Sequence, residues 1–164
     1  MTKSRGKKFE TEVSRMLSTH PQVAYVYHPP DIPPAQLLRF KHRNPIDFYC
    51  YLEGGAGVVV ECKSVKGTNL PFSRFPPHQW EALRRCSDAQ VLTFVLLNHY
   101  GWAGRDGRQS RDGQRGRCWA VPFRVLAELR EYYQGRRKSW PLDGFEIFSE
   151  LKKITGAWEW EIGA

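Results

Sequence analysis

The sequence lacks long hydrophobic runs and shows no cysteine framework. No apolar stretch approaches the roughly 18 residues of a membrane-spanning helix, and the basic N-terminus is not followed by the apolar segment of a secretory leader. Four cysteines show neither CxxC spacing nor nearby histidines: Cys50, Cys62, Cys86 and Cys118. These absences argue against a membrane protein, a disulfide-stabilised domain and a zinc site. We therefore expect a soluble cytoplasmic protein with reduced thiols.

Internal repeats and a second domain are also absent from the pattern. The 164 residues suit one domain, 1–164, that can bury a substantial core. One low-complexity stretch, 101–117, holds five glycines and five arginines. A segment of this composition is predicted to be a mobile loop within the domain.

What the chain does carry is an excess of positive charge. Lys and Arg outnumber Asp and Glu by 25 to 17, which gives a formal charge of +8. Such a surplus suits a polyanionic partner such as nucleic acid. A basic protein without that partner is the alternative.

The apolar pattern predicts an α/β domain around a mixed sheet. Helices are expected over 4–17, from about 76 to 86 and over 122–133, and strands over 23–27, 90–97 and 118–121. The inward face of the first helix would carry Phe9, Val13, Met16 and Leu17. Near the C-terminus, Trp158 and Trp160 alternate with glutamates, as in a half-buried edge strand.

The most informative segment is 44–63, NPIDFYCYLEGGAGVVVECK. Two apolar runs flank a Gly-rich reversal, which predicts a β-hairpin. With the reversal centred on Gly54, residues whose numbers sum to 108 face each other, and Asp47 lies opposite Glu61. Along the second strand, Glu61 and Lys63 point to one face and Cys62 to the other.

Two facing carboxylates beside an ammonium group favour a cation site. Like charges directly opposite each other destabilise a purely structural sheet, and a divalent cation between them would remove that cost. The alternative is a solvated strand face with a weak ion pair. The apolar run Val58–Val60 favours the cation site, because it indicates a central strand at whose end charged groups are costly.

Pro45, Ile46 and Asp47, followed by Glu61, Cys62 and Lys63, resemble the PD-(D/E)xK nuclease motif. Three further segments resemble the RecU branch of the Holliday junction resolvases: residues 4–10 (SRGKKFE), 70–79 (LPFSRFPPHQ) and 137–141 (RKSWP). The matches occur in order over most of the chain, and its compact size would suit a phage-encoded version in the host cytoplasm. About 19 residues separate Tyr27 from Asp47, where RecU proteins carry a long stalk. This departure bears on junction specificity more than on nuclease chemistry.

The resemblance implies a restriction-endonuclease-like fold, in which helices flank a mixed sheet with a catalytic hairpin. It also implies a metal-dependent endodeoxyribonuclease that nicks four-way DNA junctions in recombination and repair. Asp47 and Glu61 would be oxygen ligands of Mg²⁺ or Mn²⁺, with the Cys62 carbonyl as a third ligand. Lys63 would orient or help to deprotonate the attacking water, or stabilise charge on the phosphate.

Two further residues have a catalytic and a plainer interpretation. Glu10 would bind a metal directly or through water, or else be an exposed helical glutamate paired with Lys7. Gln79 would hydrogen-bond the attacking water or the phosphate, or else be an ordinary surface glutamine. His78 is expected to be structural or a phosphate contact. Asp31 and Asp143 are expected to be turn residues.

Basic residues near the predicted site are candidates for DNA contacts that position the substrate without reading its sequence. They are Arg5, Lys7, Lys8, Lys66 and Arg74, followed by Arg39, Lys41, Arg43 and the glycine-arginine loop. Paired incisions on a two-fold substrate would require a homodimer. The alternatives are an endonuclease for other branched or duplex DNA, and a catalytically silent DNA-binding protein on the same fold.

Overall fold

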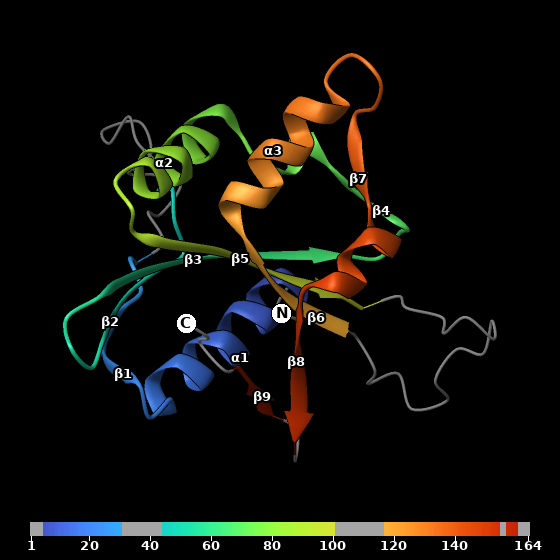
Figure 1. The fold of residues 1–164 in the computed structure, drawn as a ribbon. Helices are drawn as coiled ribbons and strands as arrows, with labels where there is room; N and C mark the ends of the chain where they lie inside the picture. The colour runs from blue at the N-terminus through green and yellow to red at the C-terminus, as the bar shows by residue number, and fades with distance from the viewer. Residues whose placement is uncertain (1–4, 31–43, 101–116, 155–156, 161–164) are drawn as a thin grey trace, which may run out of the picture.

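A mixed β-sheet with helices on both faces forms the framework of the chain (Figure 1). The computed structural model describes residues 5–30, 44–100, 117–154 and 157–160. The helices are α1 (Arg5–Thr19), α2 (Pro77–Asp88) and α3 (Phe123–Tyr133), with short 3₁₀ helices η1 (Phe72–Arg74) and η2 (Leu142–Ile147). The strands are β1 (Val23–Tyr27), β2 (Phe48–Leu52), β3 (Gly57–Val65), β4 (Asn69–Pro71), β5 (Leu92–His99), β6 (Arg117–Pro122), β7 (Ser139–Pro141), β8 (Ser149–Ile154) and β9 (Ala157–Glu159).

Within the described residues, seven strands form the main sheet in the order β1-β2-β3-β5-β6-β8-β9. Strands β3 and β5 run parallel, and every other neighbouring pair in this sheet is antiparallel. The predicted mixed α/β architecture is therefore confirmed. Strands β4 and β7 form a separate two-stranded sheet.

The predicted hairpin register is also confirmed. Phe48 pairs with Val60 and Cys50 with Val58, so that the paired residue numbers sum to 108. The reversal contains Gly54 and Gly55, which have φ angles of 93° and 91°. These left-handed conformations favour glycine, and the turn therefore fixes the register that places Asp47 level with Glu61.

Each face of the sheet is covered by its own helical layer, with α1 on one side and α2 and α3 on the other (Figure 1). The four predicted inward residues of α1 are all buried, in the layer that includes Phe48, Val58 and Val60. Leu83 of α2 and Leu126 of α3 are buried in the other layer with Val59. Because side chains alternate along a strand, Glu61 and Lys63 share the Val59 face, on which α2 packs.

Several elements were not predicted. Strand β4 and helix η1 occupy a segment that we expected to be a loop, and strands β7 and β8 had no predicted counterpart. Arg117, assigned from the sequence to the end of the glycine-arginine loop, begins β6. The rest of that loop, residues 101–116, lies outside the described residues. No described helix is long and apolar enough to cross a membrane.

The packing of α2 on the sheet predicts a difference between two leucines. Leu83 is fully buried, whereas Leu92 at the start of β5 is 41% exposed. We expect Leu83→Ala to lower the free energy of unfolding by about 2–5 kcal/mol because it leaves a cavity, and Leu92→Ala to lower it much less. Urea denaturation of both variants checks this, and equal losses would contradict the packing described.

Candidate active site

A cavity of about 400 Å³ lies where the second half of β3 meets α1, η1 and α2. Its walls come from four separate parts of the chain and are predominantly polar. The lining residues are Gly6, Glu10, Asp47, Glu61, Cys62, Lys63, Ser64, Ser73, Arg74 and Gln79. All the residues nominated from the sequence as catalytic or metal-binding therefore contribute to one cavity.

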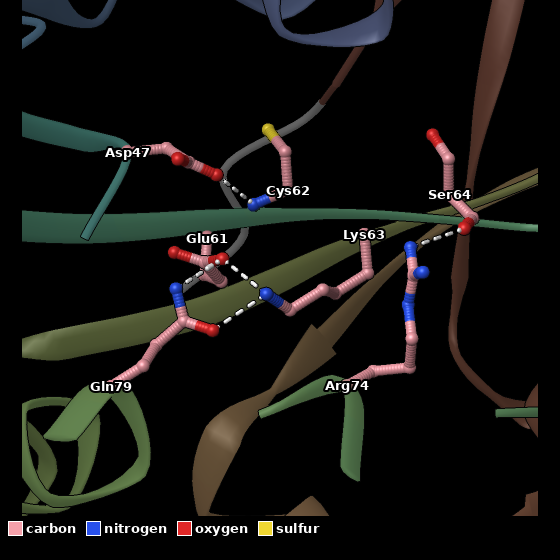
Figure 2. Close-up of polar contacts among 7 residues, drawn as sticks. All are labelled: Asp47, Glu61, Cys62, Lys63, Ser64, Arg74 and Gln79. Carbon is pink, nitrogen blue, oxygen red and sulfur yellow. Dashed lines mark hydrogen bonds and ion pairs between the residues drawn. The ribbon is translucent and has the colours of Figure 1, made fainter. Parts of the chain in front are cut away.

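Asp47 reaches the cavity because β2 begins only at Phe48, and Asp47 therefore lies just outside the ladder with β3. The ladder between the two strands extends only to the pair Phe48 and Val60. Beyond it, the backbone N–H of Cys62 donates a hydrogen bond to Asp47 Oδ2 at 2.8 Å (Figure 2). Since the N–H and C=O of one strand residue point to the same edge, the Cys62 carbonyl also faces the side on which Asp47 lies.

Glu61, Lys63 and Gln79 form a closed triangle of hydrogen bonds on the α2 side of β3 (Figure 2). Lys63 Nζ donates to Glu61 Oε1 and to Gln79 Oε1, both at 2.6 Å. Gln79 Nε2 donates to Glu61 Oε1 at 2.7 Å. The side chains of Glu61 and Lys63 are only 2% and 10% exposed. Gln79 is thus a buried partner of both charged groups, not the surface glutamine of the plainer interpretation.

The second carboxylate oxygen of Glu61 differs from the first. Oε1 accepts two hydrogen bonds, whereas Oε2 is buried and meets no donor with hydrogen-bond geometry in the described part of the chain. A buried carboxylate oxygen without a donor is costly. The arrangement is therefore incomplete as a purely structural network.

Burial and repulsion from a neighbouring carboxylate raise the pKa of both Glu61 and Asp47. The pKa of Glu61 rises from 4.5 to about 8, chiefly because burial removes water and further because of the charge on Asp47, although Lys63 opposes the change. Burial also raises the pKa of Asp47, and Glu10 adds to the effect, against the opposing hydrogen bond from Cys62. The pKa of both acids stays raised although Lys63 and Arg74 also line the cavity, so the cavity favours additional positive charge.

Glu10 has the helical partner of its plainer interpretation and also a place in the cavity lining. Its carboxylate pairs with Lys7 Nζ at 3.0 Å, as the plainer interpretation predicted. It also lines the cavity and acts electrostatically on Asp47. Glu10 therefore belongs to the site, and α1 carries it there because Phe9 and Val13 anchor the helix to the sheet.

The proposed DNA-contact residues divide into three groups. Arg74 lines the cavity and donates to the Ser64 carbonyl at 3.0 Å, while Arg5 stacks on Tyr100 at 4.6 Å. Lys8 and Lys66 are exposed and Lys7 pairs with Glu10, as described. Outside the described residues lie Arg39, Lys41 and Arg43, together with Asp31.

Two other predictions concern exposed residues. Asp143 is exposed and accepts a hydrogen bond from the Gly144 N–H, but it lies in the 3₁₀ helix η2 and not in a turn as predicted. His78 is exposed beside the buried Gln79. Sequence analysis missed Gly6, Ser64 and Ser73 as lining residues, because small residues at these positions carry no distinctive pattern.

The raised pKa of Glu61 predicts that the metal-free protein loses stability with rising pH. A carboxyl whose pKa is higher in the folded state stabilises the fold fully below about pH 4.5 and loses that contribution as pH rises through about 8. We expect the melting temperature in chelator to fall by roughly 3 °C per pH unit over this interval. Glu61→Gln, which stays neutral, should show a clearly smaller fall. Identical pH slopes for the two proteins in differential scanning calorimetry would contradict this electrostatic account.

Comparison with known proteins does not assign the chain to a family. No protein-family model matches the sequence, and no curated protein is significantly similar to it. A proposal about function must therefore rest on the geometry of the cavity and on the resemblance of its motifs.

Proposed function

We propose that the chain is a metal-dependent endodeoxyribonuclease of the PD-(D/E)xK type, with a restriction-endonuclease-like fold. The observation that carries the proposal is the convergence of Asp47, Glu61 and Lys63 on one cavity, where Glu61 Oε2 is buried and accepts no hydrogen bond from the described residues. A structural sheet or a simple DNA-binding surface gains nothing from a buried Glu61 and a partly buried Asp47 whose pKa values are both raised. A cation would complete this arrangement and would bring an anionic phosphate into the same cavity.

Mg²⁺ or Mn²⁺ fits the donor atoms. Asp47 and Glu61 offer hard oxygens, the Cys62 carbonyl faces the side on which Asp47 lies, and Glu10 of α1 also lines the cavity. Among the described residues no group of three or more His, Cys, Asp or Glu side chains is arranged to hold a metal, and the proposed set relies on two carboxylates and a backbone oxygen. When bound, the cation would supply Lewis acidity and positive charge for phosphodiester hydrolysis.

Lys63 and Gln79 would position the reacting groups. Lys63 Nζ lies over the Phe75 ring, 4.8 Å from its centre, and donates a hydrogen bond to Gln79 Oε1. A lysine fixed in this way can orient the attacking water or stabilise charge that develops on the phosphate. Arg74 at the cavity wall adds a second cation for the substrate backbone.

The substrate part of the proposal is branched DNA, with the four-way junction of recombination and repair as its principal form. It is supported by the RecU-like segments, which occur in the same order along the chain, and by the net charge of +8. Cleavage of a two-fold junction on two strands would be carried out by a homodimer in the cytoplasm. An endonuclease for other branched or duplex DNA would use the same cavity and is the second candidate.

Loss of one carboxylate should abolish hydrolysis. Labelled four-way junction and linear duplex are incubated with the protein in Mg²⁺ or in chelator. We expect Mg²⁺-dependent nicking of the junction, and a fall of roughly a hundredfold or more for Asp47→Asn, since a loss of about 3 kcal/mol in transition-state stabilisation has this effect. Asp143→Asn is the matched control, because Asp143 is exposed and distant in the chain from the cavity residues. It should keep the parent activity.

The outcomes separate the candidate functions. If neither DNA is cleaved in Mg²⁺, the enzymatic proposals are wrong and a silent DNA-binding protein remains. Equal cleavage of junction and duplex would reject the resolvase function while leaving the nuclease. Parent-level activity in Asp47→Asn would show that the cavity is not the active site.

A further inference from the structure

Four tyrosines form a row on one face of β1 and β2, which we name the tyrosine row: Tyr25, Tyr27, Tyr49 and Tyr51. They are aligned as cross-strand pairs, Tyr25 with Tyr51 and Tyr27 with Tyr49. The Tyr27 and Tyr49 ring centres are 6.3 Å apart. Aromatic residues are common in strands, and pairing alone would explain their presence. Their exposure is less ordinary, since Tyr25 is 58%, Tyr27 47% and Tyr51 56% exposed.

The row lies on the same face of the sheet as the catalytic groups. Phe48 and Cys50 point into the core beneath α1, so the alternate residues Tyr49 and Tyr51 point to the opposite face. Val26 pairs with Cys50 and packs against the α1 core, which places its neighbours Tyr25 and Tyr27 on the face of the row. On this face, α2 and α3 pack on β5 and β6, and the outer tyrosine rings stay accessible.

One end of the row lies two residues along the strand from Asp47, which lines the cavity. Tyr49 follows Asp47 by two residues and pairs with Val59, which precedes Glu61 by two residues. The Tyr27 and Tyr49 pair therefore lies next to the two acids, and the Tyr25 and Tyr51 pair lies one step further toward the hairpin turn. Residues two apart on a strand are separated by about 7 Å. The rings are thus spaced so that successive splayed bases could each meet one.

We propose that the tyrosine row binds unpaired bases of the DNA substrate by stacking, next to the phosphate that enters the cavity. This inference rests on the proposed nuclease function and specifies its substrate: DNA with single-stranded nucleotides adjoining the scissile bond. Every base has a π-face, so stacking on exposed aromatic rings tolerates any sequence. The basic surface of the chain attracts the backbone, and the tyrosines distinguish unpaired bases from bases enclosed in a duplex.

The binding test uses the full chain in chelator, so that no DNA is cut. Fluorescence anisotropy measures its affinity for a labelled single strand, for the same strand with abasic residues at its centre, and for a duplex. Tyr25→Thr/Tyr51→Thr removes two exposed rings but keeps strand-favouring residues, and Tyr25→Phe/Tyr51→Phe is the matched control that keeps the rings. The single variants Tyr25→Thr and Tyr51→Thr are measured as well, in case the double variant does not fold.

We expect the intact single strand to bind the parent at least about tenfold more tightly than the abasic strand. The double threonine variant should lose that preference, each single variant should lose part of it, and the phenylalanine variant should retain it. Duplex affinity should change less than about twofold in all of them. If the nuclease proposal is wrong, Mg²⁺-dependent cleavage will be absent while these binding preferences remain, so the two failures can be told apart.

Four binding results would overturn the inference. They are equal affinity of the parent for intact and abasic strands, an unchanged preference in the threonine variants, a parallel loss of single-strand and duplex binding, and tighter binding of single-stranded RNA than of DNA. A parent dimer that the threonine variants convert to monomer, without any change in DNA affinity, would also overturn it. That last result, measured by sedimentation, would make the tyrosine row an interface between two copies of the chain.

Discussion

The burial of Glu61 with only partial compensation is the constraint on which the site depends. One oxygen of its carboxylate accepts two hydrogen bonds, and the other is buried and meets no donor with hydrogen-bond geometry among the described residues. The backbone N–H of Asp47 lies near enough to lower the Glu61 pKa somewhat, yet burial dominates. Placing a carboxylate there costs folding energy. In return the carboxylate is held in a fixed position, as the proposed catalysis on a phosphate would require.

The sheet supplies this position through a difference in strand length. Strand β3 continues past Val60, the partner of the first residue of β2, and remains paired with β5 through Val65. Its second half is therefore paired with β5 on one edge and extends beyond its ladder with β2 on the other. Asp47 occupies the open edge, and α2 approaches from the face that carries Glu61. Helix α1 closes the remaining side through Glu10. Four short pieces of sequence therefore need to be placed correctly for one cavity to exist.

The features of this site that depend on local sequence patterns could be predicted from the sequence. The hairpin register follows from alternation and from two glycines whose positive φ angles fix the turn, and the buried face of α1 follows from its apolar spacing. The pairing of β4 with β7 was not predictable, because Leu70 and Trp140 meet across half the chain and each strand has only three residues. The burial of Gln79 was hidden for a related reason, since its polar partners lie on a different element. Propensity cannot reveal contacts that only tertiary packing creates.

The pairing of β4 with β7 also orders events during synthesis of the protein. Strand β4 leads directly into η1 and α2, which carry Ser73, Arg74 and Gln79 to the cavity. Trp140 of β7 is fully buried, with its ring 4.4 Å from Phe72 and 5.7 Å from Phe75. A nascent chain that ends before β7 thus contains every candidate catalytic residue but lacks the support for one wall of the cavity. Completion of the site is consequently a late step, and a growing polypeptide would acquire its reactive geometry only after most of its length has left the ribosome.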